Sequence, residues 1–316
     1  MALLVNFIRE FLDMLNKKVS NRLQSSYVRR YTLTEGKECG VRVIELGCGT
    51  MRALINENHG MDIMQLSHRG DNIGFISKNG FNNDNLAFGK RFEGGMIYTC
   101  GIDLIGTDPN AKIIQHGTYH TYPARVLTID EGEDYARVTG ELEFTTLFGP
   151  FLVIRRTVTL TADELTVNDE LINRGTSREK YSLLYHTNFG YPMLDEGVKI
   201  DFAAKSLDPC DDHAAAHIHQ QDNIIAPIDN EPERCYYIDT DRDYVVLTNE
   251  KLGKRVTLSY TKDTMPTLLQ WVAPRSYAYA LGIEPCTSRL GEEIEYKYID
   301  AGETVNFALH LKFENI

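Results

Sequence analysis

The sequence predicts an all-β protein, a single large antiparallel sandwich with an N-terminal amphipathic helix. Three observations favour this fold class. Apolar or β-branched residues recur with a period of two in many segments. Clusters of turn-forming residues, such as DEGED at 130–134 and NRGTSRE at 173–179, separate these segments. No helix-length segment lies between consecutive strands, which argues against a parallel α/β sheet.

The predicted elements share an alternating or β-branched composition. In chain order, the strands cover 41–46, 124–130, 135–144, 151–160, 164–174, 243–249, 254–261 and 304–313. Residues 203–234 interrupt the strand pattern with Pro, Asp and other polar residues, so we expect a long excursion on the surface there. We find no linker and no tandem repeat, and therefore expect a helical appendage over 1–25 and one sandwich domain over 26–316.

The N-terminal segment has apolar residues at helical spacing, but charged residues interrupt it before a signal peptide could form. We expect this stripe to pack on the body of the protein or on a second subunit, which leaves a homo-oligomer open, in preference to a membrane surface. No later stretch reaches the roughly 20 apolar residues that span a bilayer.

Composition narrows the classes of partner. The chain has 316 residues, 42% hydrophobic and 25% charged, which is typical of a globular protein. Lys plus Arg number 33 against 45 Asp plus Glu, a net charge of −12 that disfavours nucleic acid and anionic membranes. The six cysteines form no CxxC pair, so we expect reduced thiols and a cytoplasmic protein.

Two motifs suggest other chemistry. VIELGCGT (43–50) resembles the glycine-rich motif of S-adenosylmethionine-dependent methyltransferases, but Met51 replaces its third glycine and more strand and turn follow where a helix is needed. We expect a hairpin there and keep a methyltransferase as a third hypothesis. His213, His217 and His219 in DHAAAHIH could share a metal; without a clear fourth ligand, we expect solvated side chains and no metal or cofactor.

The candidate catalytic residues are two ionisable side chains in apolar strand contexts. His186 lies in YSLLYHTNFGYP (181–192), and Glu284 ends the apolar run of YAYALGIEPCT (277–287). A carboxylate in such a run is costly unless it is paired or used.

Two glycine-containing segments supply further candidates. RFEGGMIYTCGIDLIG (91–106) contains Arg91 and Asp103, and IIQHGTYHTYPAR (113–125) contains His116 and His120. Each of these residues could face a ligand or simply pair with its neighbours. Trp271 and Tyr279 could stack on a ligand or fill the core.

In this order, the segments resemble the galactose mutarotase-like superfamily, the aldose 1-epimerases, and more closely its DUF4432 branch. The likeness spans roughly residues 40–313 and includes GGMIYTCGIDLIG, HG at 116–117, LLYHTNFGYP, TLLQW (267–271), GIEPCT and AGETVNF. The resemblance implies a single β-supersandwich with a sugar cleft. It also implies that Glu284 is the general base and His186 the general acid.

The remaining site residues follow from the same resemblance. Arg91 and His116 would hydrogen-bond the sugar hydroxyls and ring oxygen, and Gln270 of TLLQW is a further substrate-binding candidate. Asp103, or less favourably Asp195, is a candidate for an additional sugar-holding carboxylate. The expected activity is interconversion of sugar anomers by acid–base ring opening, on a free sugar or a sugar derivative, without cofactor. The alternative is a carbohydrate-binding protein on the same scaffold, without turnover.

Overall fold

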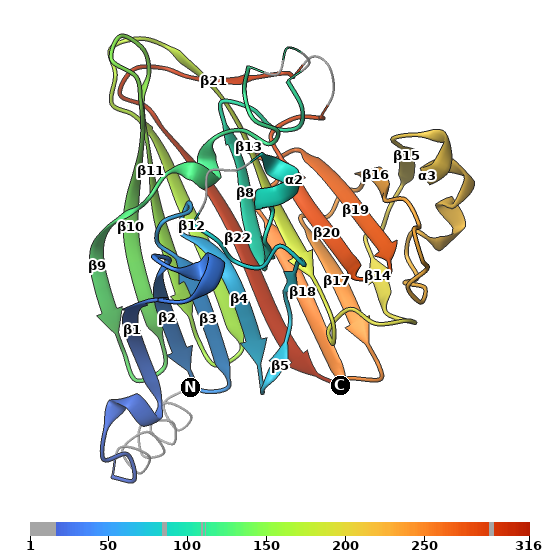
Figure 1. Cartoon of the computed structure of the whole chain (residues 1–316), viewed down its shortest axis with the longest axis horizontal. Coiled ribbons are helices and arrows are strands. Elements are labelled where there is room, and N and C mark those ends of the chain that lie inside the picture. Colours follow the sequence, from blue (N-terminus) through green and yellow to red (C-terminus); the bar gives the residue numbers. More distant parts are fainter. Residues whose placement is uncertain (1–16, 84–86, 109, 111, 291–293) are drawn as a thin grey trace, which may run out of the picture.

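Three antiparallel sheets make up the body of the protein (Figure 1). The structure is a computed structural model that describes residues 17–83, 87–108, 110, 112–290 and 294–316. Residues 1–16 of the predicted N-terminal helical segment lie outside the described residues. No helix in the described part is long and apolar enough to cross a membrane.

The sheets have five, eight and seven strands. The first has the order β1 (Ser26–Thr32), β2 (Arg42–Cys48), β3 (Met51–Asn56), β4 (Asp62–His68), β5 (Asp71–Asn72). The second has the order β14 (Lys199–Asp201), β17 (Tyr244–Asn249), β18 (Lys254–Tyr260), β22 (Thr304–Asn315), β12 (Glu164–Asn173), β11 (Phe151–Leu160), β10 (Ala136–Thr145), β9 (Arg125–Glu131). The third has the order β15 (Ser206–Pro209), β16 (Arg234–Asp239), β19 (Thr267–Arg275), β20 (Ala278–Cys286), β13 (Glu179–Phe189), β21 (Lys297–Ile299), with β8 (Ile97–Ile102) also paired to β13.

Short elements fill the connections between these strands. β6 (Phe75–Ile76) pairs with β7 (Gly94–Gly95). The α-helices described are α2 (Phe88–Arg91) and α3 (Asp212–Ala216), and the 3₁₀ turns are η1 (Arg22–Gln24), η2 (Gly36–Glu38), η3 (Tyr119–Thr121) and η4 (Ile218–Gln220).

A buried ionic cluster shows how the three sheets pack. Arg156 on β11 of the eight-stranded sheet is fully buried and donates to Asp62 on β4 (2.7 Å) and to Thr99 on β8 (3.0 Å). It also donates twice to Asp169 on β12, which accepts from the hydroxyl of Tyr185 on β13. The five- and seven-stranded sheets therefore both pack against the eight-stranded sheet, with one hydrophobic core between the layers.

The structure confirms the all-β class and the predicted strands. It also shows that VIELGCGT is a hairpin, because β2 turns at Gly49 (φ +54°) into β3 instead of a helix. The excursion over 203–234 is more ordered than expected: β15, α3 and η4 lie within it, because β15 extends the seven-stranded sheet by pairing with β16.

Candidate functional site

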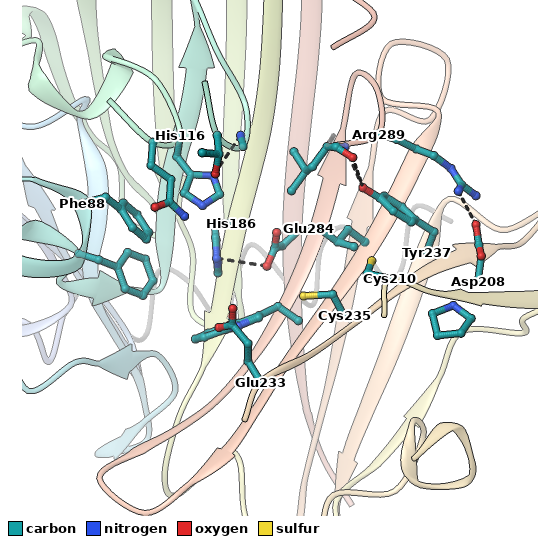
Figure 2. A pocket seen from close by; sticks show the side chains of 18 residues that line it. Phe88, His116, His186, Asp208, Cys210, Glu233, Cys235, Tyr237, Glu284 and Arg289 are labelled. Atoms are coloured by element: carbon teal, nitrogen blue, oxygen red, sulfur yellow. Dashed lines mark hydrogen bonds and ion pairs between the residues drawn. The ribbon is translucent and has the colours of Figure 1, made fainter. Parts of the chain in front are cut away.

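A cavity of about 670 Å³ lies on one face of the seven-stranded sheet (Figure 2). The sheet and the residues directly flanking its strands contribute alternate side chains, as the period-two geometry of strands requires. These are His186, Asp208, Cys210, Glu233, Cys235, Tyr237, Leu269, Trp271 and Glu284. Helix α2 and nearby loops contribute the rest of the wall, namely Phe88, Phe92, Gly106, Thr107, Gln115, His116, Arg289 and Leu290, with Pro209 at the end of β15.

His186 and Glu284 meet in this cavity although 98 positions separate them in the chain. The pairs Leu184 with Cys286 and Thr187 with Ile283 set the register of β13 and β20, so the two side chains lie at opposite positions on adjacent strands. His186 Nε2 is 3.2 Å from Glu284 Oε1. Among the described residues, Glu284 Oε1 has no hydrogen-bond partner, so the carboxyl group is available to a ligand.

A glycine makes room for the carboxylate. A Cβ at Gly282, two residues before Glu284 on the same face of β20, would lie 2.4 Å from Glu284 Oε1 and 3.1 Å from the Cβ of Trp271. Because real Cβ atoms do not approach other heavy atoms below 3.0 Å, only glycine at this position lets the carboxylate keep its place beside His186.

Burial moves the pKa values of the two groups in opposite directions. Removal from water lowers the pKa of His186 to about 3. Removal from water, reinforced by the charge of Glu233, raises the pKa of Glu284 well above its ordinary value. Burial therefore favours a protonated carboxyl beside a neutral imidazole, which differs from the ionised Glu284 and proton-carrying His186 of the sequence-based expectation. The catalytic roles of the two residues stay a prediction.

His116 presents a donor to the same cavity. Its backbone has φ +65°, an uncommon conformation for a residue with a side chain, and the backbone N–H of Gly106 donates to its Nδ1 at 3.4 Å. Burial and the charge of Arg91 lower the pKa of His116 to about 4, so the ring is neutral. With Nδ1 as acceptor, the ring proton is on Nε2.

Aromatic rings and a second carboxylate complete the wall near the pair. The Trp271 ring centroid is 5.2 Å from that of His186 and 6.2 Å from that of Phe92, both edge to face. The indole N–H donates to Glu233 Oε2 at 2.8 Å, which fixes that carboxylate at the cavity. Tyr279 does not line the cavity; its hydroxyl donates to the carbonyl of Ile225.

Three predicted substrate-binding residues lie outside the cavity lining. Gln270 points to the opposite face of β19, where it is buried and exchanges hydrogen bonds with Gln221 (2.7 and 2.8 Å). Asp103 accepts from the backbone N–H and the hydroxyl of Thr118, so it holds a loop. Arg91 is buried at the end of α2, and within the described part of the chain its three guanidinium nitrogens have no hydrogen-bond partner.

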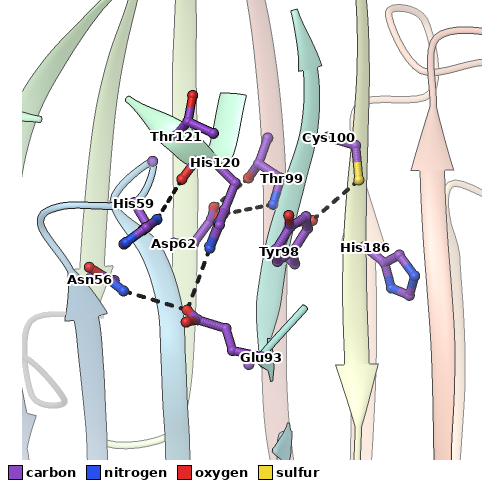
Figure 3. Close-up of polar contacts among 12 residues, drawn as sticks. Asn56, His59, Asp62, Glu93, Tyr98, Thr99, Cys100, His120, Thr121 and His186 are labelled. Carbon is purple, nitrogen blue, oxygen red and sulfur yellow. Dashed lines mark hydrogen bonds and ion pairs between the residues drawn. The ribbon is translucent and has the colours of Figure 1, made fainter. Parts of the chain in front are cut away.

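A buried polar cluster lies behind the site (Figure 3). Asp62 Oδ2 accepts from His120 Nδ1 at 2.9 Å and from the backbone N–H of Thr99 at 2.8 Å. The His120 ring stacks on Tyr98 with centroids 4.0 Å apart, and Tyr98 is the cross-strand neighbour of His186. His120 is thus a buried structural histidine, whereas His116 reaches the cavity.

Sequence reasoning missed several cavity residues. Glu233, Cys235 and Tyr237 belong to the β16 region. The sequence pattern places part of this region in the surface excursion and predicts no strand for the rest. Arg289 follows GIEPCT and forms an ion pair with Asp208. The available signal for these residues is the alternation of Glu233, Cys235 and Tyr237, which is typical of side chains on one face of a strand. Only the pairing of Cys235 with Trp271 shows that this face is the one toward the cavity.

The family model DUF4432, a domain of unknown function, matches residues 38–312. No curated protein matches the chain. Among solved structures, a proposed aldose 1-epimerase from Klebsiella pneumoniae is similar at TM-score 0.82, with 19% identity over 92% of this chain and 88% of the other.

Two further solved structures share the fold. A galactose mutarotase-like protein from Clostridium acetobutylicum has TM-score 0.69 and 15% identity, covering 93% of this chain and all (100%) of the other. A proposed mutarotase from Salmonella typhimurium has TM-score 0.68 and 11% identity, covering 92% of this chain and 94% of the other.

Proposed function

Because the chain belongs to the DUF4432 family and has a galactose mutarotase-like fold, we propose that it is a carbohydrate mutarotase that interconverts the anomers of an aldose or aldose derivative. The observation that carries this proposal is the His186–Glu284 pair, 3.2 Å apart in a cavity large enough for a sugar. The names given to the similar structures add support for the reaction class, since their proposed activities are aldose 1-epimerase and mutarotase.

The chemistry requires one acid and one base. Opening the hemiacetal ring removes the proton from the C1 hydroxyl and adds a proton to the ring oxygen, which breaks the bond between C1 and that oxygen. Rotation about the C1–C2 bond and reclosure, with the same proton transfers reversed, give the other anomer. A positioned acid or base typically contributes about 10²–10⁴-fold.

The burial of the two groups supports a division of the acid and base roles between them. Burial favours protonated Glu284 and neutral His186. In our proposal Glu284 therefore donates to the ring oxygen while His186 Nε2 accepts the C1 hydroxyl proton, and the roles reverse on reclosure. The pair holds one proton before and after the reaction, so no metal or redox cofactor has to enter the proton balance.

Other cavity groups would hold the sugar. The Nε2–H of His116 can donate to a hydroxyl or the ring oxygen, and Glu233 can accept from hydroxyls. The rings of Trp271 and Phe92 offer apolar faces to the carbon skeleton. Arg91 and Asp103 remain predictions for sugar contact, and they would need a rearrangement of the cavity wall. All six cysteines are unpaired, which supports placing the protein in a reducing compartment such as the cytoplasm.

The test measures relaxation between anomers for a panel of aldoses by NMR exchange or polarimetry. We expect acceleration by the wild type and a loss of at least about 10²-fold in Glu284→Gln and in His186→Ala. The exposed Glu295 supplies a matched control, Glu295→Gln, which should retain the wild-type rate. Equal rates for all four proteins would refute the proposal, and calorimetric sugar binding without acceleration would favour the carbohydrate-binding alternative.

A further inference from the structure

A second cluster of metal-ligating side chains lies on the excursion beside the cavity. Helix α3 begins after Asp211, whose side chain accepts from the backbone N–H of Ala214. His213 and His217 are four residues apart and therefore share one face of the helical turn, with ring centroids 4.5 Å apart. Glu231, in the segment that leads into β16, faces them, and one ligand atom from each of the three residues lies within 4.8 Å of the others.

One of the two imidazoles is oriented as metal ligands usually are. His217 Nδ1 is 2.8 Å from the carbonyl oxygen of His213, and because a carbonyl can only accept, this nitrogen carries the ring proton. The lone pair of His217 is then on Nε2. Metal-bound histidines typically donate their other ring N–H to such a carbonyl, which fixes the tautomer and the ring orientation.

His213 and Glu231 can supply the other two ligand atoms for a cation. His213 Nε2 is buried and has no hydrogen-bond partner in the part of the chain that the structure describes, although it lies 3.4 Å from Glu231 Oε1. Arg234 donates to the same carboxylate and, through its other terminal nitrogen, to Gln220 at 2.7 Å. A carboxylate has two oxygens and about four lone-pair sites, so Glu231 can bind a metal while it keeps Arg234 as an outer partner.

We propose that His213, His217 and Glu231 bind one Zn²⁺ or a similar divalent transition-metal ion. Two imidazole nitrogens and one carboxylate oxygen, with water in the fourth position, form a ligand set that Zn²⁺ uses in tetrahedral sites. Bringing atoms now up to 4.8 Å apart to Zn–ligand distances of about 2.0–2.2 Å requires small rotations of side chains, which their partial exposure permits.

The third histidine of the sequence triplet is outside the site. His219 lies on η4, where its Nε2 is 3.3 Å from the side-chain nitrogen of Gln220. The ligand that the sequence did not reveal is Glu231, which comes from the other end of the excursion. His219 therefore serves as a matched control of the same residue type in the same segment.

The ion would connect the two ends of the excursion. Cys210 lies three residues before His213, and Glu233 lies two residues after Glu231, and both line the cavity. This consequence rests on the proposed function, whereas metal binding itself does not. The test is therefore a binding measurement that needs no sugar.

The experiment titrates the metal-free full chain with Co²⁺, followed by visible absorption, and with Zn²⁺, followed by calorimetry. We expect one ion per chain with a nitrogen- and oxygen-ligand spectrum and no thiolate charge-transfer band. Because loss of outer partners alone weakens metal sites about 10–100-fold, His213→Ala and Glu231→Gln should each weaken binding at least about 100-fold. His219→Ala should bind as the wild type does.

Three outcomes would overturn the site. These are an absence of saturable Co²⁺ and Zn²⁺ binding, equal affinity in the wild type, His213→Ala and Glu231→Gln, or a thiolate band that disappears in Cys210→Ser. Circular dichroism identifies folded variants. If Glu231→Gln fails to fold because it leaves Arg234 unpaired, His213→Ala decides. An absence of mutarotase activity in a wild type that binds the metal would count against the proposed function alone.

Discussion

Gly282→Ala perturbs the His186–Glu284 pair by a single methyl group. The new Cβ would lie 2.4 Å from Glu284 Oε1, so the carboxylate must retreat by at least 0.6 Å to reach the 3.0 Å minimum. The backbone of Gly282 does not have a positive φ, and alanine is therefore compatible with it. The carboxylate is the free end of a side chain and can rotate away. The Cβ of Trp271, 3.1 Å from the new methyl group, has to shift by only a few tenths of an ångström.

We therefore expect a large effect on activity and a small one on stability. A misplacement of about 1 Å in a reacting group can cost about 10²-fold in rate, and we expect a loss of that order in kcat/KM for anomer exchange. Overpacking of this kind typically costs about 1–3 kcal/mol, and we expect the lower end, measured by urea denaturation. Relaxation rates by NMR exchange supply the activity.

Gly89→Ala is the matched control, because a Cβ at Gly89 in α2, which contributes to the cavity wall, meets nothing within 4 Å. It should retain the wild-type rate. If Gly282→Ala keeps its rate within about threefold of the control, the reasoning that the position of Glu284 limits the reaction is refuted.

Two further predictions follow from burial. With the pKa of His186 at about 3 and that of Glu284 raised, protonated Glu284 and neutral His186 persist as the pH falls, so the rate should stay nearly constant from pH 7 to pH 5.5. If His186 had the ordinary pKa of about 6.5, the fraction of its base form would fall about 10-fold over that range. Relaxation rates measured at several pH values distinguish the two cases. Asp169→Ala leaves buried Arg156 without one of its two carboxylate partners and should lower the free energy of unfolding, measured by urea denaturation, by about 3–5 kcal/mol. The control is Asp300→Ala, which removes the exposed partner of Arg178 and should lower it by less than about 1 kcal/mol. Equal losses in both variants would contradict a structural role for the buried cluster.

The misses of sequence analysis have a common physical reason. Whether a strand residue points to the cavity or to the core depends on which face of its sheet is covered, and one step along the strand reverses the answer. Gln270 and Trp271 are neighbours in TLLQW, yet the first is buried between sheets and the second lines the cavity. Likewise His116 and His120 share one short segment, but only the first faces the cavity.

The sequence by itself determined the all-β class, eight of the strands and the two principal candidate residues, because period-two alternation and an ionisable residue inside an apolar run are local features. Only the tertiary structure decided that His186 and Glu284 are opposite one another in register, that burial favours their neutral forms, and that Glu231 instead of His219 joins His213 and His217. Pairing between distant strands and the loss of water around a side chain are properties of the packed chain, and no local pattern encodes them.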